Sequence, residues 1–376
     1  MKKILIVASS YFFIRTFLIP HIRYWVENGW MVHLASENDG TTIPYAHRQI
    51  DIPIKRTPLH MSNLTAVCRL RQLMNEERYD IVNCHTPIGA MVARMAASQS
   101  RRRYGTKVVY MTHGLHFYNG AKKKNWMLYC PAEMSLASYT DAIISINEED
   151  RLLIEKYFPQ IPYQYKLPGI GYDTRHIGAL GLQDRDALRR KYSLQSDDFV
   201  LLYIARYTAD KNHRFLIKSL VDIQRKIERC KIVMVGDGEE MVACRKLARD
   251  LNVDDSVIFA GFQLNITDYL QMADVGVSPS VSEGLGLGIV EEMYASLPIL
   301  ASRVRGHRDL INHGENGLLF TLNDKYDFIE KLIYLYNNPS FRINMGRTAH
   351  IGVEKYSIEN VIPQLVNIFE ELMNAH

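Results

Sequence analysis

The most informative stretch of this sequence is SPSVSEGLGLGIVE, residues 278–291. It starts at the end of an apolar strand, contains three alternating glycines (Gly284, Gly286 and Gly288) and runs into a helix. Glycines at such a turn let backbone amides approach a ligand closely. The helix start adds free N–H groups and a positive dipole end, which suit phosphate or sugar oxygens. The stretch therefore predicts a strand-to-helix turn that binds an oxygen-rich ligand.

Two acids flank these glycines, Glu283 at the exit of the strand and Glu291 on the first turns of the helix. This spacing predicts that both carboxylates point into one ligand site. The alternative, a close-packing turn with two solvated glutamates, stays open for a glycine-rich turn by itself. Glu292 is predicted to lie on a different face, as a solvated surface acid.

Apolar strands alternate with amphipathic helices on both sides of this stretch. The N-terminal half has predicted strands at Lys2–Ala8, Met31–Ala35, Ile81–Cys84, Val108–Thr112 and Ala142–Ile146. After a break at LPGIGYD (167–173), the pattern restarts with strands at Phe199–Ala205, Lys231–Val235, Val257–Ala260, Val275–Pro279 and Pro298–Ala301. Such alternation predicts parallel sheets covered by helices on both faces.

The predicted fold is therefore α/β, with two Rossmann-like, doubly wound domains that face each other across a cleft. Residues 1–172 form the first domain and residues 173–356 the second. Residues 357–376 form an amphipathic helix that can pack back on the N-terminal domain. A chain of 376 residues is long enough for two such domains.

Composition excludes several other classes of protein. Hydrophobic residues make up 47% and charged residues 23%, which argues against long disorder, collagen and coiled-coil rods. No uncharged apolar run reaches the roughly 18–20 residues of a membrane span. Met1-Lys2-Lys3 and the apolar run after it imitate a signal peptide, but Arg15 interrupts them early. A disulfide framework or zinc site is disfavoured, because the five cysteines form no Cys-x-x-Cys pair, and a cytoplasmic protein is predicted.

Charge is distributed unevenly. Residues 1–180 carry 22 Lys+Arg against 14 Asp+Glu, a net +8, and the remainder carries 23 against 27, a net −4, which together give the overall +4. A basic N-terminal half suits an anionic lipid surface, a diphosphate or a nucleic acid. The sequence has no recognition helix, finger or stacking-sheet signature, so nucleic acid is the weakest of these partners.

A second cluster follows the first strand of the C-terminal half, with Arg206 and Lys211 five positions apart. A planar guanidinium and a compact ammonium together suit a diphosphate. A solvated charged loop is the alternative, but the position at a strand's carboxyl end favours a ligand. Asp184-Arg185-Asp186 is a rival metal motif, which we interpret as the capped start of a helix.

These motifs resemble a known family. Arg206 with Lys211, GDG (236–238), Glu283 with Glu291 and GENGLL (314–319) occur in the order found in glycosyltransferase family 4, whose members are retaining enzymes of the GT-B fold. CHTP (84–87) and THGLHFY (112–118) look like the branch that builds bacterial exopolysaccharide, capsule and lipid-linked oligosaccharide. The likeness covers nearly the whole chain.

The resemblance implies a role for each matching position. Arg206 and Lys211 would hold the donor's diphosphate, Glu291 the ribose, and Glu283 the hydroxyls of the transferred sugar. His113 would line the donor-sugar pocket, so that His113 and Glu283 are the candidate catalytic residues. The remaining donor contacts would come from Ser9, Gly236, Leu285, Gly286, Leu287 and Gly288.

Three N-terminal positions carry open alternatives. Many family members have a glycine pair where this chain has Ser9-Ser10, which alters the geometry of that loop. Arg15 would serve an acceptor diphosphate or simply lie on the surface. His85 has a functional or a buried, hydrogen-bonded role. His116 follows His113 without a nearby carboxylate or thiolate ligand, so zinc is disfavoured.

The predicted function is transfer of a sugar, from a UDP-linked hexose or N-acetylhexosamine donor, to a polyprenyl-diphosphate-linked saccharide. No cofactor and no metal are expected, because Arg206 and Lys211 would neutralise the diphosphate. Peripheral association with the inner face of the cell membrane is predicted from two basic clusters with an aromatic residue nearby. These clusters are Arg101, Arg102, Arg103 and Lys122, Lys123, Lys124 with Trp126.

Other functions remain open at this stage. The nearest are a nucleotide-sugar epimerase, a phosphorylase of the same architecture, and a noncatalytic subunit of a polysaccharide assembly complex. A dinucleotide-dependent oxidoreductase should carry Gly-x-Gly-x-x-Gly directly after its first strand, where this chain has Ser9-Ser10.

Overall fold

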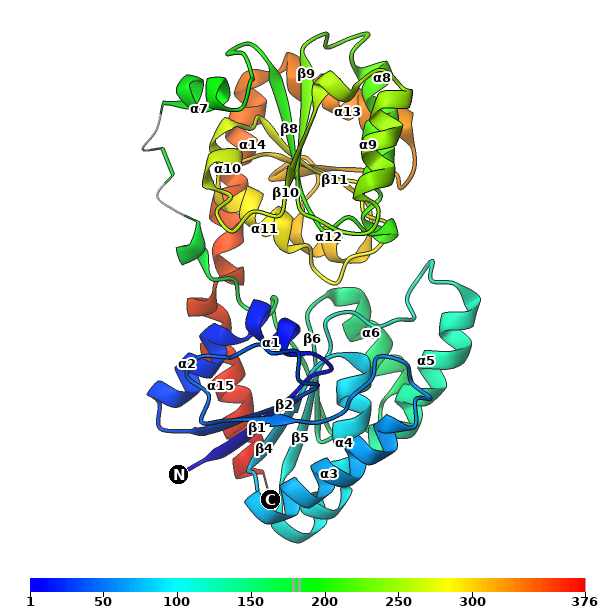
Figure 1. Cartoon of the computed structure of the whole chain (residues 1–376), viewed down its shortest axis with the longest axis vertical. Coiled ribbons are helices and arrows are strands. Elements are labelled where there is room, and N and C mark those ends of the chain that lie inside the picture. The colour runs from blue at the N-terminus through cyan, green and yellow to red at the C-terminus, as the bar shows by residue number, and fades with distance from the viewer. Residues whose placement is uncertain (178–179, 182–183, 376) are drawn as a thin grey trace. The chain divides into compact units, whose positions relative to one another are not determined.

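The computed structural model describes residues 1–177, 180–181 and 184–375, and the chain divides into two compact units (Figure 1). Unit 1 comprises Met1–Gly171 and Ile358–His376, and unit 2 comprises Tyr172–Ser357. Each unit is an α/β domain built on a parallel sheet, as the alternating strand and helix signals predict.

Unit 1 contains a seven-stranded sheet in the order β3-β2-β1-β4-β5-β6-β7, with every pairing parallel. The central strands are mostly apolar and almost entirely buried, as expected when helices cover both faces. The strands are β1 (Lys3–Val7), β2 (Met31–Ser36), β3 (Arg48–Asp51), β4 (Ile81–Cys84), β5 (Lys107–Met111), β6 (Ala142–Ser145) and β7 (Tyr163–Lys166).

The helices of unit 1 are α1 (Tyr11–Phe17), α2 (Ile19–Glu27), α3 (Ser62–Glu77), α4 (Pro87–Tyr104), α5 (Lys123–Leu136), α6 (Glu148–Tyr157) and α15 (Ile358–Asn374). Residues from α3, α4, α5 and α6 share one hydrophobic core with the sheet. Trp25 of α2 stacks on Phe369 of α15, with ring centroids 5.2 Å apart. Local signals set the ends of α4, which begins with Pro87 and ends at Gly105 in the left-handed conformation.

Unit 2 contains a six-stranded parallel sheet in the order β10-β9-β8-β11-β12-β13. The strand order reverses between β8 and β11, so that the chain winds outward in both directions from β8. The strands are β8 (Phe199–Ile204), β9 (Cys230–Val235), β10 (Val257–Gly261), β11 (Val275–Ser278), β12 (Ile299–Ser302) and β13 (Gly317–Phe320).

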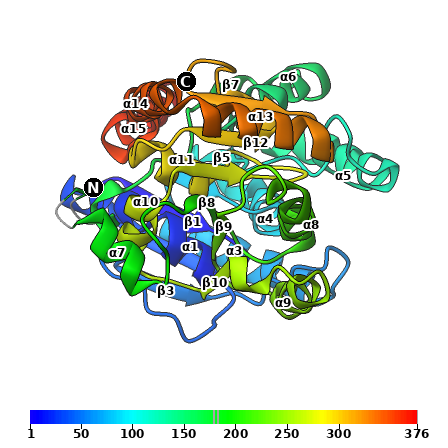
Figure 2. The ribbon, with the colours of Figure 1, turned by 90° about the horizontal axis from the view of Figure 1, so that it is seen from above.

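The helices of unit 2 are α7 (Arg185–Lys191), α8 (His213–Ile223), α9 (Met241–Asp250), α10 (Thr267–Met272), α11 (Leu287–Tyr294), α12 (Arg305–Leu310), α13 (Lys325–Asn337) and α14 (Pro339–Val353). Helix α8 contacts α9 and α13, whereas α11 contacts α14 and α10 contacts α7. Figure 2 shows α8 beside α9 and α7 beside α10.

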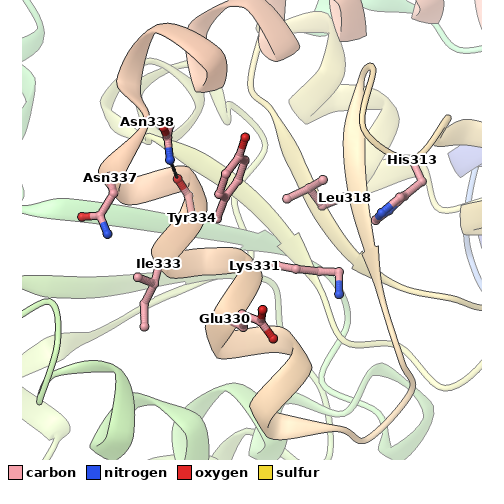
Figure 3. A pocket seen from close by; sticks show the side chains of 8 residues that line it. All are labelled: His313, Leu318, Glu330, Lys331, Ile333, Tyr334, Asn337 and Asn338. Atoms are coloured by element: carbon pink, nitrogen blue, oxygen red, sulfur yellow. Dashed lines mark hydrogen bonds between the residues drawn. The ribbon is translucent and has the colours of Figure 1, made fainter.

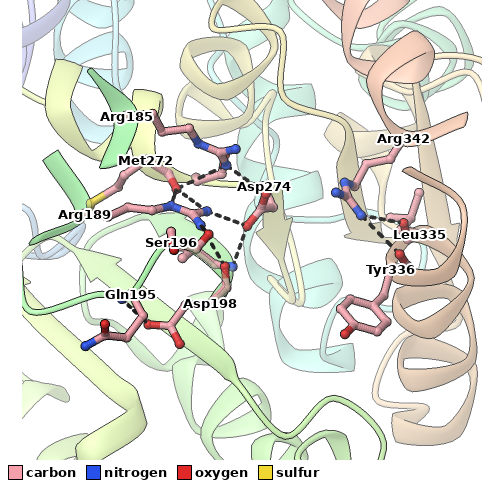
Figure 4. Close-up of polar contacts among 12 residues, drawn as sticks. Arg185, Arg189, Gln195, Ser196, Asp198, Met272, Asp274, Leu335, Tyr336 and Arg342 are labelled. Atoms are coloured by element: carbon pink, nitrogen blue, oxygen red, sulfur yellow. Dashed lines mark hydrogen bonds and ion pairs between the residues drawn. The ribbon is translucent and has the colours of Figure 1, made fainter. Parts of the chain in front are cut away.

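Helix α7 is held by a network around Arg189, which is 3% exposed (Figure 4). Its guanidinium pairs with Asp274 at 2.8 Å and donates to the Met272, Ser196 and Asp198 carbonyl oxygens. Arg185 donates to the other oxygen of Asp274. The network ties α7 to the end of α10 and the start of β11. Within the described residues, no helix has both the length and the apolarity to cross a membrane.

Candidate active site

Two loops of unit 2 bring together the candidate donor-binding residues. Arg206 and Lys211 follow β8, and the stretch from Glu283 to Glu291 follows β11, the neighbouring strand. Both loops leave the carboxyl ends of their strands, at the point where the strand order reverses. Open α/β sheets bind their ligands at such a switch point.

An ion pair joins the two loops. Lys211 Nζ lies 2.5 Å from Glu283 Oε1, and the same oxygen accepts a 2.8 Å hydrogen bond from Ser280 Oγ. Tyr203 donates its hydroxyl to the Lys211 carbonyl at 2.7 Å. Burial, with the charge of Glu283, raises the pKa of the Tyr203 phenol well above its ordinary value. Lys211 and the Glu283 carboxylate are therefore held in place by hydrogen bonds to two buried side chains, Tyr203 and Ser280. Arg206 is exposed.

Two glycines allow backbone to lie against backbone in these loops. A Cβ on Gly288 would lie 2.3 Å from the Ile204 carbonyl oxygen, at the end of β8. A Cβ on Gly236 would lie 2.0 Å from the Ala205 carbonyl oxygen, and its φ is +140°. Side chains at either position would push the loops apart, so both glycines are required for the close approach.

Helix α12 hydrogen-bonds the loop that follows β11, a contact that was not predicted from the sequence. Gly306 N–H and Arg305 Nε donate to the Glu283 carbonyl at 3.3 and 3.1 Å. His307 is fully buried, donates from Nδ1 to the Ser302 carbonyl at 2.8 Å and accepts from Ser278 Oγ at 3.2 Å. Burial lowers the pKa of His307, so its imidazole is neutral. The RGH triplet (305–307), two residues after a buried strand, is the signal that could have found this contact.

Glu291 is partly exposed on α11 and hydrogen-bonds the phenol of Tyr172, which is 7% exposed. Burial and the nearby Glu291 carboxylate raise the pKa of Tyr172, so the phenol stays a donor. Leu285 is buried, and Gly286, Leu287 and Gly288 are partly exposed at the start of α11.

The prediction for Glu292 is wrong. Its side chain is 1% exposed, and neither carboxylate oxygen has a hydrogen-bond partner among the described residues. One oxygen occupies the space that a Cβ on Gly276 would need. Burial, with the neighbouring charge of Glu291, raises the pKa of Glu292 well above its ordinary value. Glu292 is therefore a buried carboxyl of unit 2 and not a surface acid.

Three predicted residues of unit 1 follow strands at the carboxyl end of its sheet. Ser9 follows β1, His85 follows β4 and His113 follows β5. Ser9 N–H donates to Thr86 Oγ1 at 3.0 Å, and a Cβ on Gly89 would collide with this loop, which shows how closely α4 packs on it. His85 is 1% exposed and hydrogen-bonds His113 at 3.0 Å. Its position matches the buried, hydrogen-bonded role that was one of the two alternatives for this residue. Arg15 is exposed, with its guanidinium 5.7 Å from the Phe12 ring centroid.

The two basic clusters lie at opposite ends of the sheet of unit 1. Arg101, Arg102 and Arg103 end α4 and precede the amino end of β5, where they complement the helix dipole. Arg101 pairs with Asp141 at 2.6 Å and donates to the Ser138 carbonyl, so it holds the fold together and is not a free cation. The membrane role of Arg101 stays a prediction.

Lys122, Lys123 and Lys124 are exposed at the start of α5, after the carboxyl end of β5. Cations at a helix N-terminus oppose the helix dipole, so they do not stabilise this helix. Trp126 packs its ring against Phe117 and Tyr157 and donates Nε1–H to the Tyr118 carbonyl, so it anchors α5 to the core. The exposed apolar side chains of this turn are Met127 and Leu128, at 79% and 56%.

The interpretation of Asp184 as a helix cap is confirmed, since its side chain accepts from Asp186 N–H at the start of α7. No group of three metal-ligating side chains occurs within the described part of the chain. A surface pocket of about 410 Å³ lies between β13 and α13 (Figure 3) and contains none of the predicted site residues. Its His313 already accepts from Leu319 N–H, and its Asn338 donates to the Tyr334 carbonyl.

Comparison with known proteins identifies the family. Residues 184–351 match the family described as Glycosyl transferases group 1, and residues 3–147 match that described as Glycosyl transferase 4-like. EpsD of Bacillus subtilis (strain 168), named provisionally as a glycosyltransferase, is 36% identical over 99% of this chain and 97% of its own length.

Two further proteins are informative. The UDP-Gal:alpha-D-GlcNAc-diphosphoundecaprenol alpha-1,3-galactosyltransferase of Escherichia coli is 25% identical over 83% of this chain and 81% of its own. Anabaena HepE, solved in complex with UDP and glucose, has a TM-score of 0.80 over 99% of this chain and 100% of its own, at 18% identity, which shows the fold. The chain, as its motifs predict, thus belongs to the group 1 and family 4-like glycosyltransferases, and its two parallel-sheet α/β domains have the GT-B fold.

Proposed function

We propose that this protein is a retaining glycosyltransferase that moves a hexose or N-acetylhexosamine from a UDP-linked donor to a polyprenyl-diphosphate-linked saccharide. The product would be an intermediate of a bacterial surface polysaccharide. The observation that carries the proposal is the arrangement of two cations and two acids at the strand reversal of unit 2. UDP and glucose in the HepE structure support the donor class, and the acceptor named for the E. coli relative supports the lipid diphosphate.

In the proposed reaction, the bond between the anomeric carbon and the diphosphate breaks and its electron pair leaves with the diphosphate. The negative charge that develops on the diphosphate is stabilised by Arg206, by N–H groups of Lys211 and by the backbone amides at Gly286–Gly288. The acceptor hydroxyl attacks from the face that the leaving group vacates, and its proton passes to the departing phosphate oxygen. Attack on that face retains the anomeric configuration.

The remaining residues orient the donor. Glu291, held by the Tyr172 phenol, binds the ribose, and Glu283, held by Lys211 and Ser280, binds hydroxyls of the transferred sugar. His113 gives a further contact to that sugar, and Ser9, Gly236, Leu285 and Leu287 contribute backbone contacts. No metal cofactor is required on this proposal, because Arg206 and Lys211 supply the positive charge.

We also propose that the protein binds the inner face of the cell membrane through Lys122–Lys124, Met127 and Leu128. Lysines attract anionic headgroups, and the exposed Met and Leu side chains enter the interface. Arg15 would serve the acceptor diphosphate. Arg102 and Arg103 lie at the other end of the sheet and are left out of this surface.

The test is to incubate the purified protein with a panel of nucleotide sugars and an undecaprenyl-diphosphate-linked saccharide, and to follow nucleoside diphosphate release and the anomeric configuration of the product by NMR. Glu291→Gln should lower kcat/KM about 100-fold or more. Glu228→Gln, at an exposed acid of the same unit, is the matched control. Turnover that requires added Mg²⁺, or a product of inverted configuration, would contradict the corresponding part of the proposal.

A further inference from the structure

The histidines at the carboxyl end of the unit 1 sheet form an unusual pair. His85 Nδ1 lies 3.0 Å from His113 Nε2, and the two rings are 21° from parallel. Phe13 packs against both, with ring centroids 4.9 Å from His113 and 5.8 Å from His85. Two lone pairs, or two N–H groups, would repel each other at this distance. A single proton therefore lies between the two nitrogens.

Both rings are neutral. Burial lowers the pKa of His113 to about 3 and that of His85 well below its ordinary value, and a charge on His21 would lower both further. Burial also lowers the pKa of His21 to about 4, so none of the three is charged near neutral pH. Each neutral imidazole carries one proton. The ring that accepts the shared hydrogen bond must therefore carry its own proton on its other nitrogen.

Two arrangements are possible, because either His85 Nδ1 or His113 Nε2 can carry the shared proton. The other nitrogen of His85, Nε2, decides between them. His85 Nε2 is buried and has no hydrogen-bond partner among the described residues. A buried N–H without an acceptor costs more than a lone pair without a donor. The proton of His85 is therefore on Nδ1, where it is donated to His113 Nε2. His113 must then carry its own proton on Nδ1, where the cost is smaller, because His113 is partly exposed and its Nδ1 is not among the buried nitrogens that lack a partner.

We propose that His85 is a positioning residue that fixes His113 in the Nδ1–H tautomer, so that His113 offers a neutral N–H donor to an oxygen of the bound ligand. The identity of that ligand as the donor sugar rests on the proposed function, whereas the tautomer does not. A neutral donor also stabilises a sugar oxygen without repelling the positive charge that develops at the anomeric carbon.

The direct test is a two-bond ¹H–¹⁵N correlation spectrum of the full chain labelled with ¹⁵N-histidine, recorded at pH 7 without ligand. His85→Asn, His85→Leu and His113→Asn assign the signals. The expected result is Nδ1–H for both His85 and His113 in the wild type. Finding Nε2–H on His113 in the wild type would overturn the proposal, and this outcome requires no variant of His85 to be stable.

The variants test the positioning role. His85→Asn keeps an N–H near the place of Nδ1, so His113 should remain Nδ1–H, whereas His85→Leu should shift it to Nε2–H. With UDP-glucose as the probe, His85→Leu should lower the kcat of donor hydrolysis about tenfold and His85→Asn should restore most of it. An unchanged tautomer in His85→Leu would contradict the proposal even if turnover fell. If the wild type does not turn over any nucleotide sugar while the spectra are as expected, the proposed function fails and the tautomer stands.

Discussion

Lys211 Nζ lies 2.5 Å from Glu283 Oε1, so an ion pair connects the loops that follow β8 and β11. The two side chains are 21% and 13% exposed, and Ser280 donates to the same carboxylate oxygen. Glu283 therefore depends on Lys211 for its orientation as well as for its charge compensation. A substitution of Lys211 has to be interpreted through both effects.

Lys211→Ala should lower the free energy of unfolding of unit 2 by about 1–3 kcal/mol, because it leaves Glu283 without its cation while some solvent contact remains. Its kcat/KM should fall about 100-fold or more. The double variant Lys211→Ala/Glu283→Gln should recover stability but not turnover. Denaturant unfolding and nucleotide release measure the two effects, and Lys218→Ala, at an exposed lysine of α8, is the control. Recovery of turnover in the double variant would contradict the assigned roles.

Glu292→Gln should change how stability depends on pH. The pKa of Glu292 is raised in the folded protein, so the folded state holds its proton at pH values where the unfolded state has lost it. The wild type therefore loses stability as pH rises above the unfolded pKa, by up to about 1.4 kcal/mol per pH unit, until the folded pKa is reached. The glutamine variant lacks this loss.

The measurement is chemical unfolding of both proteins from pH 4.5 to 8. The stability of Glu292→Gln relative to the wild type should increase steadily with pH. Parallel curves would mean that Glu292 is ionised in the folded protein. Donor binding should change little, since the carboxyl is 1% exposed and does not reach a ligand.

Gly288→Ala should damage the donor site through the backbone. The new Cβ would lie 2.3 Å from the Ile204 carbonyl oxygen, so α11 must move away from β8. We expect a loss of about 1–3 kcal/mol in stability and weaker binding of UDP, measured by calorimetry. The control is Gly352→Ala in α14, where the nearest atom is 3.5 Å away and stability should rise by up to about 1 kcal/mol. Unchanged UDP binding in Gly288→Ala would show that the start of α11 is not part of the donor site.

Binding to anionic vesicles should depend on the lysines of α5. Replacing Lys122, Lys123 and Lys124 by Gln should weaken co-sedimentation with vesicles that contain phosphatidylglycerol, by about 1 kcal/mol for each lysine. Arg102→Gln/Arg103→Gln should have little effect, because these arginines lie at the other end of the sheet. Neutral vesicles should bind the wild type and both variants poorly. An equal loss of binding to anionic vesicles in the lysine and arginine variants would contradict this choice of surface.

The sequence was sufficient for the central strands of both sheets and for one edge strand, β10, but not for the edge strands β3, β7 and β13. Strands β3 and β7 were not predicted, because RQID and YQYK are partly exposed edge strands without an apolar run. The sequence pattern placed Arg206 and Lys211 after one strand, and Glu283 and Glu291 after another. The pairing of these two strands, β8 and β11, comes from the structure, because they are not consecutive in the chain.

Contacts made through tertiary packing were not predictable in the same way. Glu292 was expected in solvent, although it lies three positions after Ile289 and one before Met293, on the buried stripe of α11. That spacing was a signal, and Gly276 provides the space for a carboxyl that no local pattern indicates. The clusters Arg101–Arg103 and Lys122–Lys124 looked alike as charge runs, and only their positions at opposite helix ends distinguish them.

The course of the chain has a consequence for biosynthesis. Unit 1 includes α15, whose Phe369 stacks on Trp25, so this element of unit 1 is synthesised only after the whole of unit 2. Unit 2 is complete in sequence by residue 357 and is free to fold while the nascent chain is still growing. The usual order, in which the amino-terminal domain matures before the next, is therefore reversed. A fragment that stops before residue 358 would leave Trp25 uncovered and favour aggregation.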